Sequence, residues 1–495
     1  MFSQLPSAEF AEPADRSDAD VAADLPRAER DHEWETRMTV RSNAVDVKKW
    51  NAEYQWHPFS DPNAVAGDKP LIIESGKGAV VHDIDGKEYI DGQGGLWNVN
   101  AGHGRKEIID AIAGQLQQLQ YYSLFGGTTH ARSIELSKML VDMTAREGMK
   151  RVFFSTGGSE AVETALKLAR QYWKLEGQPQ RTKIISLQRA YHGVGYGGIS
   201  ANGTPAFRRM FEPLMPGFFR VESPYFYRNP FTDDPAELAR ICAMLLERAI
   251  LDQSPDTVAA FIAEPIQGAG GIIVPPAEYW PLVRQVCDKY GVLLIADEVV
   301  TGFGLTGSML GSRLWGVQPD MMVFAKGINS GYVPLGATMF NERIERAFKD
   351  HPDAGFMHGN TYLAHPLACA AALANLDMVV KEGLPENADD IGRYFMARLG
   401  ELADRQKHVG EVRGRGLMIG VELVADKKTK ARFADADLFG HYVARRCRDN
   451  GVLIRNVYDT FIISPPLILS KAQVDRIVET MDEALTHQTG VFSRK

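Results

Sequence analysis

The stretch EYWPLVRQVCDKYGVLLIADEV, residues 278–299, decides the fold. Its first thirteen residues are typical of a helix, Gly291 ends that helix, and an apolar strand follows at once. Outward from this unit, helical stretches alternate with more short apolar strands, at 151–155, 183–188, 258–265, 321–327 and 334–340. Strands separated by helices favour crossover connections and a mostly parallel sheet covered on both faces. We therefore predict an α/β fold.

The chain on either side of this region has a different pattern. Residues 71–92 alternate short β-rich runs with glycine-containing turns, which predicts a small sheet, and the chain after about residue 366 predicts a smaller α+β domain. We predict a large domain and three further parts. These are a tail at 1–45, an N-terminal segment at 46–90 that joins the small domain, the large domain at 91–365 and the small domain at 366–495.

The composition favours a compact protein that acts on small molecules. The chain has 495 residues, of which 45% are hydrophobic, so it can bury a large core. Its net charge is −8, and residues 1–35 hold ten acids against three arginines, which is seven of the eight excess negative charges. That segment predicts a flexible acidic tail. The charge balance of the chain favours neither nucleic acid nor an anionic membrane as a partner.

Nothing in the sequence predicts export, a membrane span or a metal site. The N-terminus is acidic, whereas a transit peptide is rich in arginine and a secretory signal has an apolar run, so we expect the cytoplasm. The four cysteines are scattered without CxxC or Cys/His spacing, which predicts buried thiols, with neither disulfides nor zinc.

Three polar signals follow strands of the predicted sheet. The turn Gly157, Gly158 and Ser159 opens a helix, Asp297 ends one strand, and Lys326 ends the next. Because the carboxyl ends of parallel strands line one crevice, we expect all three signals to face the same place. A helix N-terminus attracts an anion, and a buried carboxylate can hold a protonated ring nitrogen. This combination suits an aromatic cofactor that carries a phosphate.

Each signal also has a plainer interpretation. The glycine turn alone is more often a simple helix start, and a lysine after a strand is usually solvated. Asp297 could instead hold a metal, as in nucleotide hydrolases, but no GxxxxGK[ST] loop accompanies it. For Lys326, an apolar run before it predicts desolvation, which favours the free amine that attacks carbonyl groups to form a Schiff base.

Six motifs in order resemble those of the class III, or omega, aminotransferases. They are FFSTGGSEAVETALKLAR, RAYHG, AEPIQGAGG, IADEVVTGFGLTG, AKGINSGYVPLGA and GNTYLAHPLACAAAL. The resemblance runs from about Trp50 to the C-terminus. It implies the fold of the fold type I transferases that depend on pyridoxal 5′-phosphate, with that compound as cofactor.

The resemblance also implies a role for each matching residue. Lys326 would bind the cofactor covalently, Asp297 would pair with its pyridine nitrogen, and Gly158 with Ser159 would hold its phosphate. The free amine of Lys326 would then serve as general acid and base, with ping-pong transfer between an amine and a keto acid.

Three more residues complete the implied cofactor site. Tyr191 would stack on the cofactor ring, and Val299 would press on the opposite face. Thr361 would reach the phosphate of the neighbouring subunit's cofactor. The active unit would then be a homodimer, with a dimer of dimers left open.

The substrate segments resemble the amine:pyruvate branch of the family. In GLWNVNAGHGRKEI, Trp97 would line the pocket, although it could equally be a core residue. Arg455 would clamp the carboxylate of pyruvate and swing aside for an uncharged amine. Members that use 2-oxoglutarate place an arginine where this chain has Ile462, and Glu264 is the usual partner of that arginine. We therefore expect pyruvate as the acceptor.

Two positions depart from the family pattern. Leu305 stands where an arginine is common, and Gly126 stands where an aromatic is common, so the pocket could admit a longer or wider amine. The donor stays open among β-alanine, taurine, a diamine and a long-chain amine. The alternatives are an aminomutase or racemase of the same fold, a 2-oxoglutarate-dependent aminotransferase, and a protein that kept the fold without catalysis.

Overall fold

The computed structural model describes residues 44–61, 70–434 and 436–487. The predicted acidic tail, as far as residue 43, lies outside the described residues. The described residues divide into two compact units, one that ends at Ile72 and one that begins at Ile73. In the first unit, the turn after α2 (Ala44–Tyr54) contacts that helix, because His57 Nε2 lies 2.9 Å from Oδ1 of Asn51 in α2.

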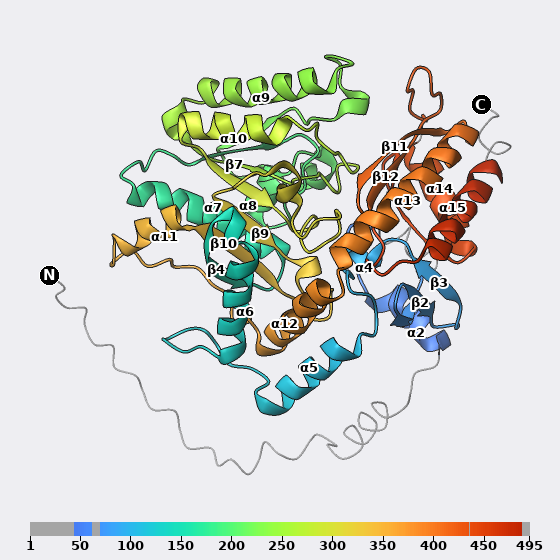
Figure 1. The fold of residues 1–495 in the computed structure, drawn as a ribbon, viewed down its shortest axis with the longest axis horizontal. Coiled ribbons are helices and arrows are strands. Elements are labelled where there is room, and N and C mark those ends of the chain that lie inside the picture. The colour runs from blue at the N-terminus through green and yellow to red at the C-terminus, as the bar shows by residue number, and fades with distance from the viewer. Residues whose placement is uncertain (1–43, 62–69, 435, 488–495) are drawn as a thin grey trace, which may run out of the picture. The chain divides into compact units, whose positions relative to one another are not determined.

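A seven-stranded sheet forms the centre of the second unit (Figure 1). Its strands are β4 (Met149–Ser155), β5 (Lys183–Leu187), β6 (Phe218–Val221), β7 (Val258–Ala263), β8 (Leu293–Asp297), β9 (Met321–Phe324) and β10 (Gly336–Asn341). The spatial order is β4-β10-β9-β8-β7-β5-β6. Only β10 runs antiparallel to its neighbours within this sheet, so the mostly parallel α/β fold is confirmed.

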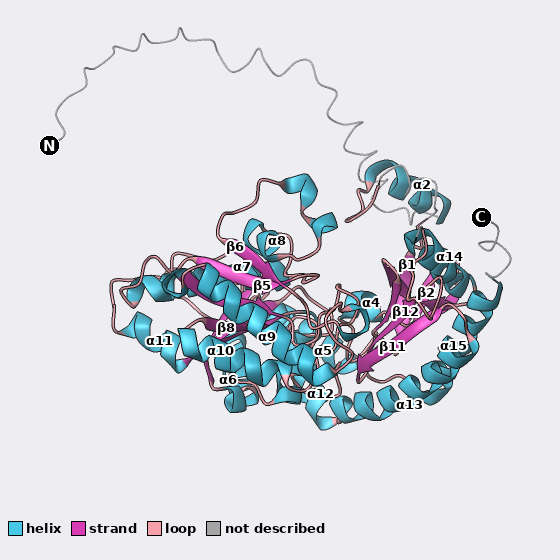
Figure 2. Cartoon of the chain, turned by 90° about the horizontal axis from the view of Figure 1, so that it is seen from above, coloured by secondary structure: helices cyan, strands magenta, loops and turns pink. Residues whose placement is uncertain are grey.

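Helices cover both faces of this sheet, because successive side chains of its strands point to opposite sides. On β7, Ala260 and Ile262 pack with α7 (Gly158–Leu175). On the same strand Phe261 and Ala263 pack with the opposite layer, α9 (Pro235–Asp252) and α10 (Tyr279–Tyr290) (Figure 2). The helix predicted before Gly291 is therefore present, and Gly291 ends it with a φ of 68°.

A third group of helices lies on the β4 side of the sheet. The helix α6 (Ala131–Met143) packs on β4, α12 (Pro366–Lys381) packs on α6, and α5 (Lys106–Gln118) packs on α12, while α11 (Glu342–Lys349) contacts α7 and β4. Leu136 and Leu140 of α6 share one apolar cluster with Met339 of β10 and Cys369 of α12. The short helices α4 (Gly94–Trp97) and α8 (Tyr196–Ala201) lie in loops that border the site described below.

Two four-stranded sheets complete the second unit. One has the order β1 (Ile73–Lys77), β2 (Val80–Asp83), β3 (Glu88–Asp91) and β13 (Val452–Leu453). The other has the order β11 (Val409–Arg415), β12 (Met418–Leu423), β15 (Thr460–Ile463) and β14 (Arg455–Val457). It packs with α13 (Leu384–Arg405), α14 (Ala436–Asp449) and α15 (Lys471–Thr486). The parallel pairing of β13 with β3 joins the chain near residue 90 to the C-terminal part. The predicted domain boundaries stay predictions.

The cysteines and the helices agree with the sequence analysis where the structure describes them. All four cysteines, Cys242, Cys287, Cys369 and Cys447, are buried free thiols, as predicted. Within the described ranges no helix combines the length and the apolar character that a membrane crossing requires.

Leu305, which departs from the family pattern, lies at a tight contact between segments. Its side chain is buried in the core of the C-terminal part, and its carbonyl accepts a hydrogen bond of 2.9 Å from the Leu417 N–H. Next to Leu417, Gly416 has a φ of 56° and touches Gly392 of α13. A Cβ at Gly392 would lie 2.2 Å from the Gly416 carbonyl oxygen, so only glycine fits there.

This contact predicts opposite effects for two glycines of α13. We expect Gly392→Ala to lower the free energy of unfolding by about 1–3 kcal/mol, because the added methyl meets backbone. Gly400→Ala should raise it by about 0.5–1 kcal/mol, since nothing lies within 4 Å and alanine favours the helix. Denaturant titration of both variants checks this, and a stable Gly392→Ala protein would contradict the packing.

Candidate active site

Three segments meet at the carboxyl edge of the large sheet. The helix α7 starts at Gly158 after an extended Gly157, and no side chain caps its free N–H groups. A Cβ at Gly158 would lie 3.1 Å from Cγ1 of Val299, a residue that follows β8. It would lie 3.5 Å from the Cβ of Ala325, a residue that follows β9. The three signals therefore face one place, as expected, and the uncapped helix start is suited to an anion.

Asp297 is buried at the end of β8 with both oxygens in hydrogen bonds. Its Oδ2 lies 2.7 Å from Nδ1 of His192, and its Oδ1 accepts a hydrogen bond of 3.1 Å from the Val299 N–H. Only 3% of Asp297 is exposed. A carboxylate held in this way is suited to a cationic partner such as a protonated ring nitrogen.

Lys326 follows β9 and opens a short 3₁₀ turn, Lys326–Ile328. Its φ is 49°, a left-handed value that is uncommon for a residue with a side chain and that often marks a functional site. Desolvation lowers the pKa of its amine from 10.5 to about 8, although Asp297 and Glu264 oppose the shift. The amine is therefore far closer to its neutral, nucleophilic form than an ordinary lysine.

Trp97 contacts the two cationic side chains of the site. Its ring centroid is 5.1 Å from Lys326 Nζ and 5.7 Å from Arg455 Cζ. The loop that carries it is locked to the turn of Lys326, because a Cβ at Gly327 would lie 2.4 Å from Asn100 Nδ2. Trp97 is 6% exposed, so it is buried and yet touches both groups that the sequence assigned to chemistry and substrate.

Glu264 and Tyr191 lie in the same cluster. Glu264 accepts hydrogen bonds from the N–H of Tyr191 at 3.2 Å and from the N–H of Gly268 at 2.9 Å. Burial, with a contribution from Asp297, raises the pKa of its carboxyl to about 7. Burial also raises the pKa of the Tyr191 phenol, whose ring packs edge to face on Phe207 at 5.5 Å.

Ser159 ties the start of α7 to the turn after Tyr191. Its Oγ accepts a hydrogen bond of 3.2 Å from the Val194 N–H. Gly193, with a φ of 98°, allows this approach, since a Cβ there would lie 2.6 Å from Ser159 Oγ. The hydroxyl therefore lies at the uncapped helix start.

Among the described residues, Thr361 is the one predicted site residue that does not contact the cluster around Lys326 and Asp297. It is exposed, and its carbonyl accepts a hydrogen bond of 2.7 Å from the Tyr121 hydroxyl. The carbonyl of Ala364, three residues later, lies 2.7 Å from His130 Nε2. The turn with Thr361 is thus held by the segment around residues 121–130.

His192 is the residue of this cluster that the sequence analysis missed. Its side chain is fully buried, and Nε2 has no hydrogen-bond partner in the described part of the chain. The only sequence signal was its place next to Tyr191 in the YHG turn. The contact with Asp297 joins positions 105 residues apart, which no local pattern reveals.

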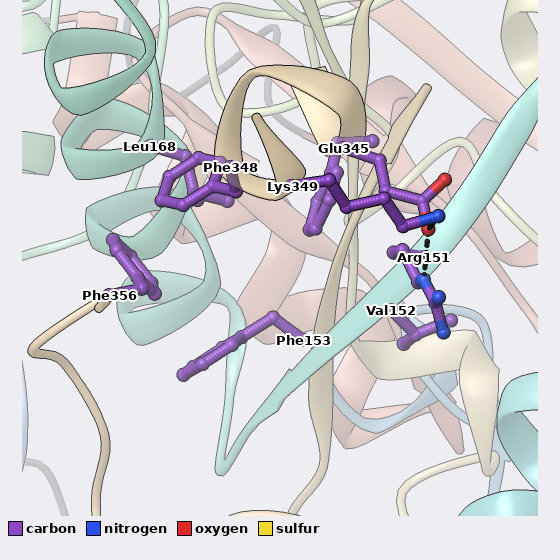
Figure 3. A pocket seen from close by; sticks show the side chains of 9 residues that line it. Arg151, Val152, Phe153, Leu168, Glu345, Phe348, Lys349 and Phe356 are labelled. Atoms are coloured by element: carbon purple, nitrogen blue, oxygen red, sulfur yellow. Dashed lines mark hydrogen bonds and ion pairs between the residues drawn. The ribbon is translucent and has the colours of Figure 1, made fainter. Parts of the chain in front are cut away.

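A separate hollow of about 380 Å³ lies beside β4 and α11 (Figure 3). Its floor is apolar, with Phe153, Phe348 and Phe356 among the lining residues. At its rim, Arg151 Nε and Lys349 Nζ lie 2.6 Å and 2.8 Å from the same oxygen of Glu345. None of the predicted site residues lines it, and its cations are already paired.

Comparison with known proteins agrees with this geometry. The family model of class-III aminotransferases matches residues 63–485. A putrescine–pyruvate aminotransferase of Pseudomonas aeruginosa is 40% identical over 445 residues, which is 89% of this chain and 96% of the relative.

Two solved structures share the fold over nearly their whole length. One is a pyridoxal-phosphate-bound amine transaminase from an uncultivated Pseudomonas species. It has a TM-score of 0.85 and 48% identity, over 88% of this chain and 98% of its own. The other is an (S)-enantioselective omega-transaminase from Thermomicrobium roseum. Its TM-score is 0.88 and its identity 41%, over 90% of this chain and 99% of its own.

The fold and the site thus define an enzyme of the pyridoxal-phosphate aminotransferase class. The chain belongs to the class III aminotransferase family. Its cofactor is pyridoxal 5′-phosphate. The residues fit that compound, because an uncapped helix start, a buried carboxylate and a lysine of lowered pKa meet at one edge of the sheet.

Proposed function

We propose that this aminotransferase moves an amino group from an omega-amine or omega-amino acid to a keto acid, with pyruvate as the preferred acceptor, by a ping-pong mechanism. The observation that carries the proposal is the arrangement around Trp97. Lys326 and Arg455 lie at 5.1 Å and 5.7 Å from the same ring, which supports placing the reacting amine and a carboxylate-binding cation near one another.

In this proposal the cofactor is held by the residues that the resemblance indicated. Lys326 would bind it covalently, Asp297 would hold its ring nitrogen, and the N–H groups at Gly158 with the hydroxyl of Ser159 would bind its phosphate. Tyr191 and Val299 would enclose its ring. Support comes from the contacts that join the start of α7 to Val299 and Asp297 to its buried partner.

Lys326 has two tasks in the reaction that we propose. Pyridoxal 5′-phosphate, when bound, supplies the electron sink that lets a proton leave the carbon beside the amino group. Lys326 Nζ would take that proton as general base and return it as general acid. A pKa of about 8 suits this work, because the group can both hold and release a proton near neutral pH.

The choice of pyruvate rests on two paired strand positions. Arg455 of β14 lies directly opposite Ile462 of β15 in the antiparallel register. Residues paired in this way have side chains on the same face of a sheet. The arginine that 2-oxoglutarate-dependent members carry at the position of Ile462 is thus replaced by a fully buried aliphatic side chain. Arg455 is left to bind the carboxylate of the acceptor.

We also propose a homodimer in which Thr361 completes the cofactor site of the partner subunit. Thr361 is exposed, and exposed apolar side chains flank it in the same turn and in the segment that holds it. These are Tyr122, Phe125, Met357 and Tyr362. Apolar side chains gathered in this way are typical of an interface. The cytoplasm stays the predicted compartment.

The reaction is tested by its two halves. We expect one of β-alanine, taurine, putrescine or a long-chain amine to convert the bound cofactor to its pyridoxamine form, and pyruvate to restore the original visible spectrum. Faster restoration by 2-oxoglutarate would overturn the acceptor. Turnover of an amine without any keto acid would indicate the alternative, an aminomutase or racemase.

The lowered pKa of Lys326 predicts how covalent cofactor uptake depends on pH. Only the neutral amine attacks, so below its pKa the rate for the apoprotein should rise about tenfold per pH unit and become constant above about pH 8. Stopped-flow absorbance measures the rate, and Lys326→Ala should take up no cofactor covalently. A rate that still rises beyond about pH 10 would indicate an ordinary lysine.

Arg455 predicts a selective loss for the keto acid. We expect Arg455→Gln to raise the KM for pyruvate about tenfold to hundredfold, because a charge-assisted pair is lost, and to change the KM for an uncharged amine less than about threefold. Arg455→Lys is the matched control and should fall between, since lysine keeps the charge without the planar fork. Equal losses for both substrates would exclude this role.

A further inference from the structure

The bond between His192 and Asp297 is the most enclosed polar contact of the site. The exposed fractions of the two side chains are 0% and 4%. Nδ1 of His192 lies 2.7 Å from Asp297 Oδ2, and the other carboxylate oxygen accepts from the Val299 N–H. Two donors at two oxygens fix the plane of this carboxylate.

The geometry also fixes the hydrogen on the imidazole ring. A carboxylate oxygen accepts, so Nδ1 of His192 must be the donor. Nε2 is buried and has no partner among the residues that the structure describes. The ring therefore carries a hydrogen on Nδ1 that is committed to Asp297, and Nε2 makes no hydrogen bond within the described residues.

The backbone of His192 is anchored independently of its ring. Its N–H donates a hydrogen bond of 2.6 Å to Asn202 Oδ1, and Asn202 Nδ2 donates one of 2.9 Å to the Gly193 carbonyl. The carbonyl of Asn202 accepts in turn from Arg220 Nε at 2.7 Å. The turn therefore keeps its position without help from the imidazole, whose donor is left to act on Asp297.

We propose that His192 is a positioning residue of the reaction, whose Nδ1–H holds the Asp297 carboxylate in the orientation that meets the ring nitrogen of the cofactor. This rests on the role proposed above for Asp297. An oriented carboxylate costs no reorganisation when the cofactor binds or when charge develops on its ring. Loss of the donor should therefore weaken cofactor binding and slow the chemical step together.

Two substitutions separate this role from simple filling of space. His192→Asn puts an amide nitrogen near the place of Nδ1 and so keeps a donor to Asp297. His192→Leu has a similar bulk and no donor. A ring that only fills space would tolerate leucine at least as well as asparagine, whereas a positioning residue would tolerate asparagine better.

The experiment measures pyridoxal 5′-phosphate affinity of the apoproteins by titration, then kcat and KM of the amine half-reaction. We expect His192→Leu to weaken the affinity and to lower kcat about tenfold to hundredfold, with the KM for the amine changed less than about threefold. His192→Asn should stay within about threefold of the unaltered protein in both readings. Equal losses in the two variants, or no loss in His192→Leu, would overturn the proposal.

A double-mutant cycle with Asp297→Asn tests whether His192 acts through Asp297. Once that carboxylate is gone, His192→Leu should change the cofactor affinity less than about threefold further. An undiminished effect would overturn the proposal. If His192→Leu does not fold, His192→Gln takes its place, because its amide nitrogen lies near the position of Nε2 instead of Nδ1. If the unaltered protein converts no amine, the proposed function fails, while the affinity series still reports on His192.

Discussion

The close approach of Gly158 to Val299 and Ala325 sets where the other groups of the site can lie. Three segments that follow β4, β8 and β9 converge there, and a Cβ on Gly158 would already lie 3.1 Å from Val299 Cγ1. The convergence puts the uncapped start of α7 beside Val299, two residues after Asp297, and beside Ala325, the residue before Lys326. The close packing of the Val299 and Ala325 side chains on Gly158 thus brings an uncapped helix end, a carboxylate and an amine to the same edge of the sheet.

Burial of charge is the second constraint, and it acts differently on the acidic and basic groups. Desolvation lowers the pKa of Lys326 to about 8 and raises that of Glu264 to about 7. Both shifts move the groups toward their neutral forms near physiological pH. Asp297 keeps two hydrogen-bond donors, one of them the His192 ring. Glu264 also accepts two hydrogen bonds, but both come from backbone N–H groups, so the two carboxyl groups differ in that only Asp297 has a side-chain partner among the described residues.

The sequence alone predicted the features that depend on local pattern. Asp297 and Lys326 could be placed at strand ends because apolar runs precede them, and the topology of parallel strands then brought them to one edge. Strand β6, Phe218–Val221, was missed because it is only four residues long and contains an arginine. The ring contact of His192 could not be predicted from local pattern, since it joins residues that are distant in the sequence.

The register of β14 and β15 bears on the charges around Arg455 and Glu264. With Ile462 opposite Arg455, the arginine that usually partners Glu264 in related enzymes is missing, and Glu264 has hydrogen bonds only from two backbone N–H groups among the described residues. Burial, with a contribution from Asp297, raises the pKa of the Glu264 carboxyl to about 7. The two backbone N–H groups oppose this rise less than a neighbouring positive charge would. Near neutral pH the pocket therefore contains a permanent cation at Arg455 and only a partly ionised Glu264. If Arg455 binds the acceptor as we propose, that imbalance would favour an anionic acceptor that needs one cation, and no second arginine would have to be buried beside Glu264.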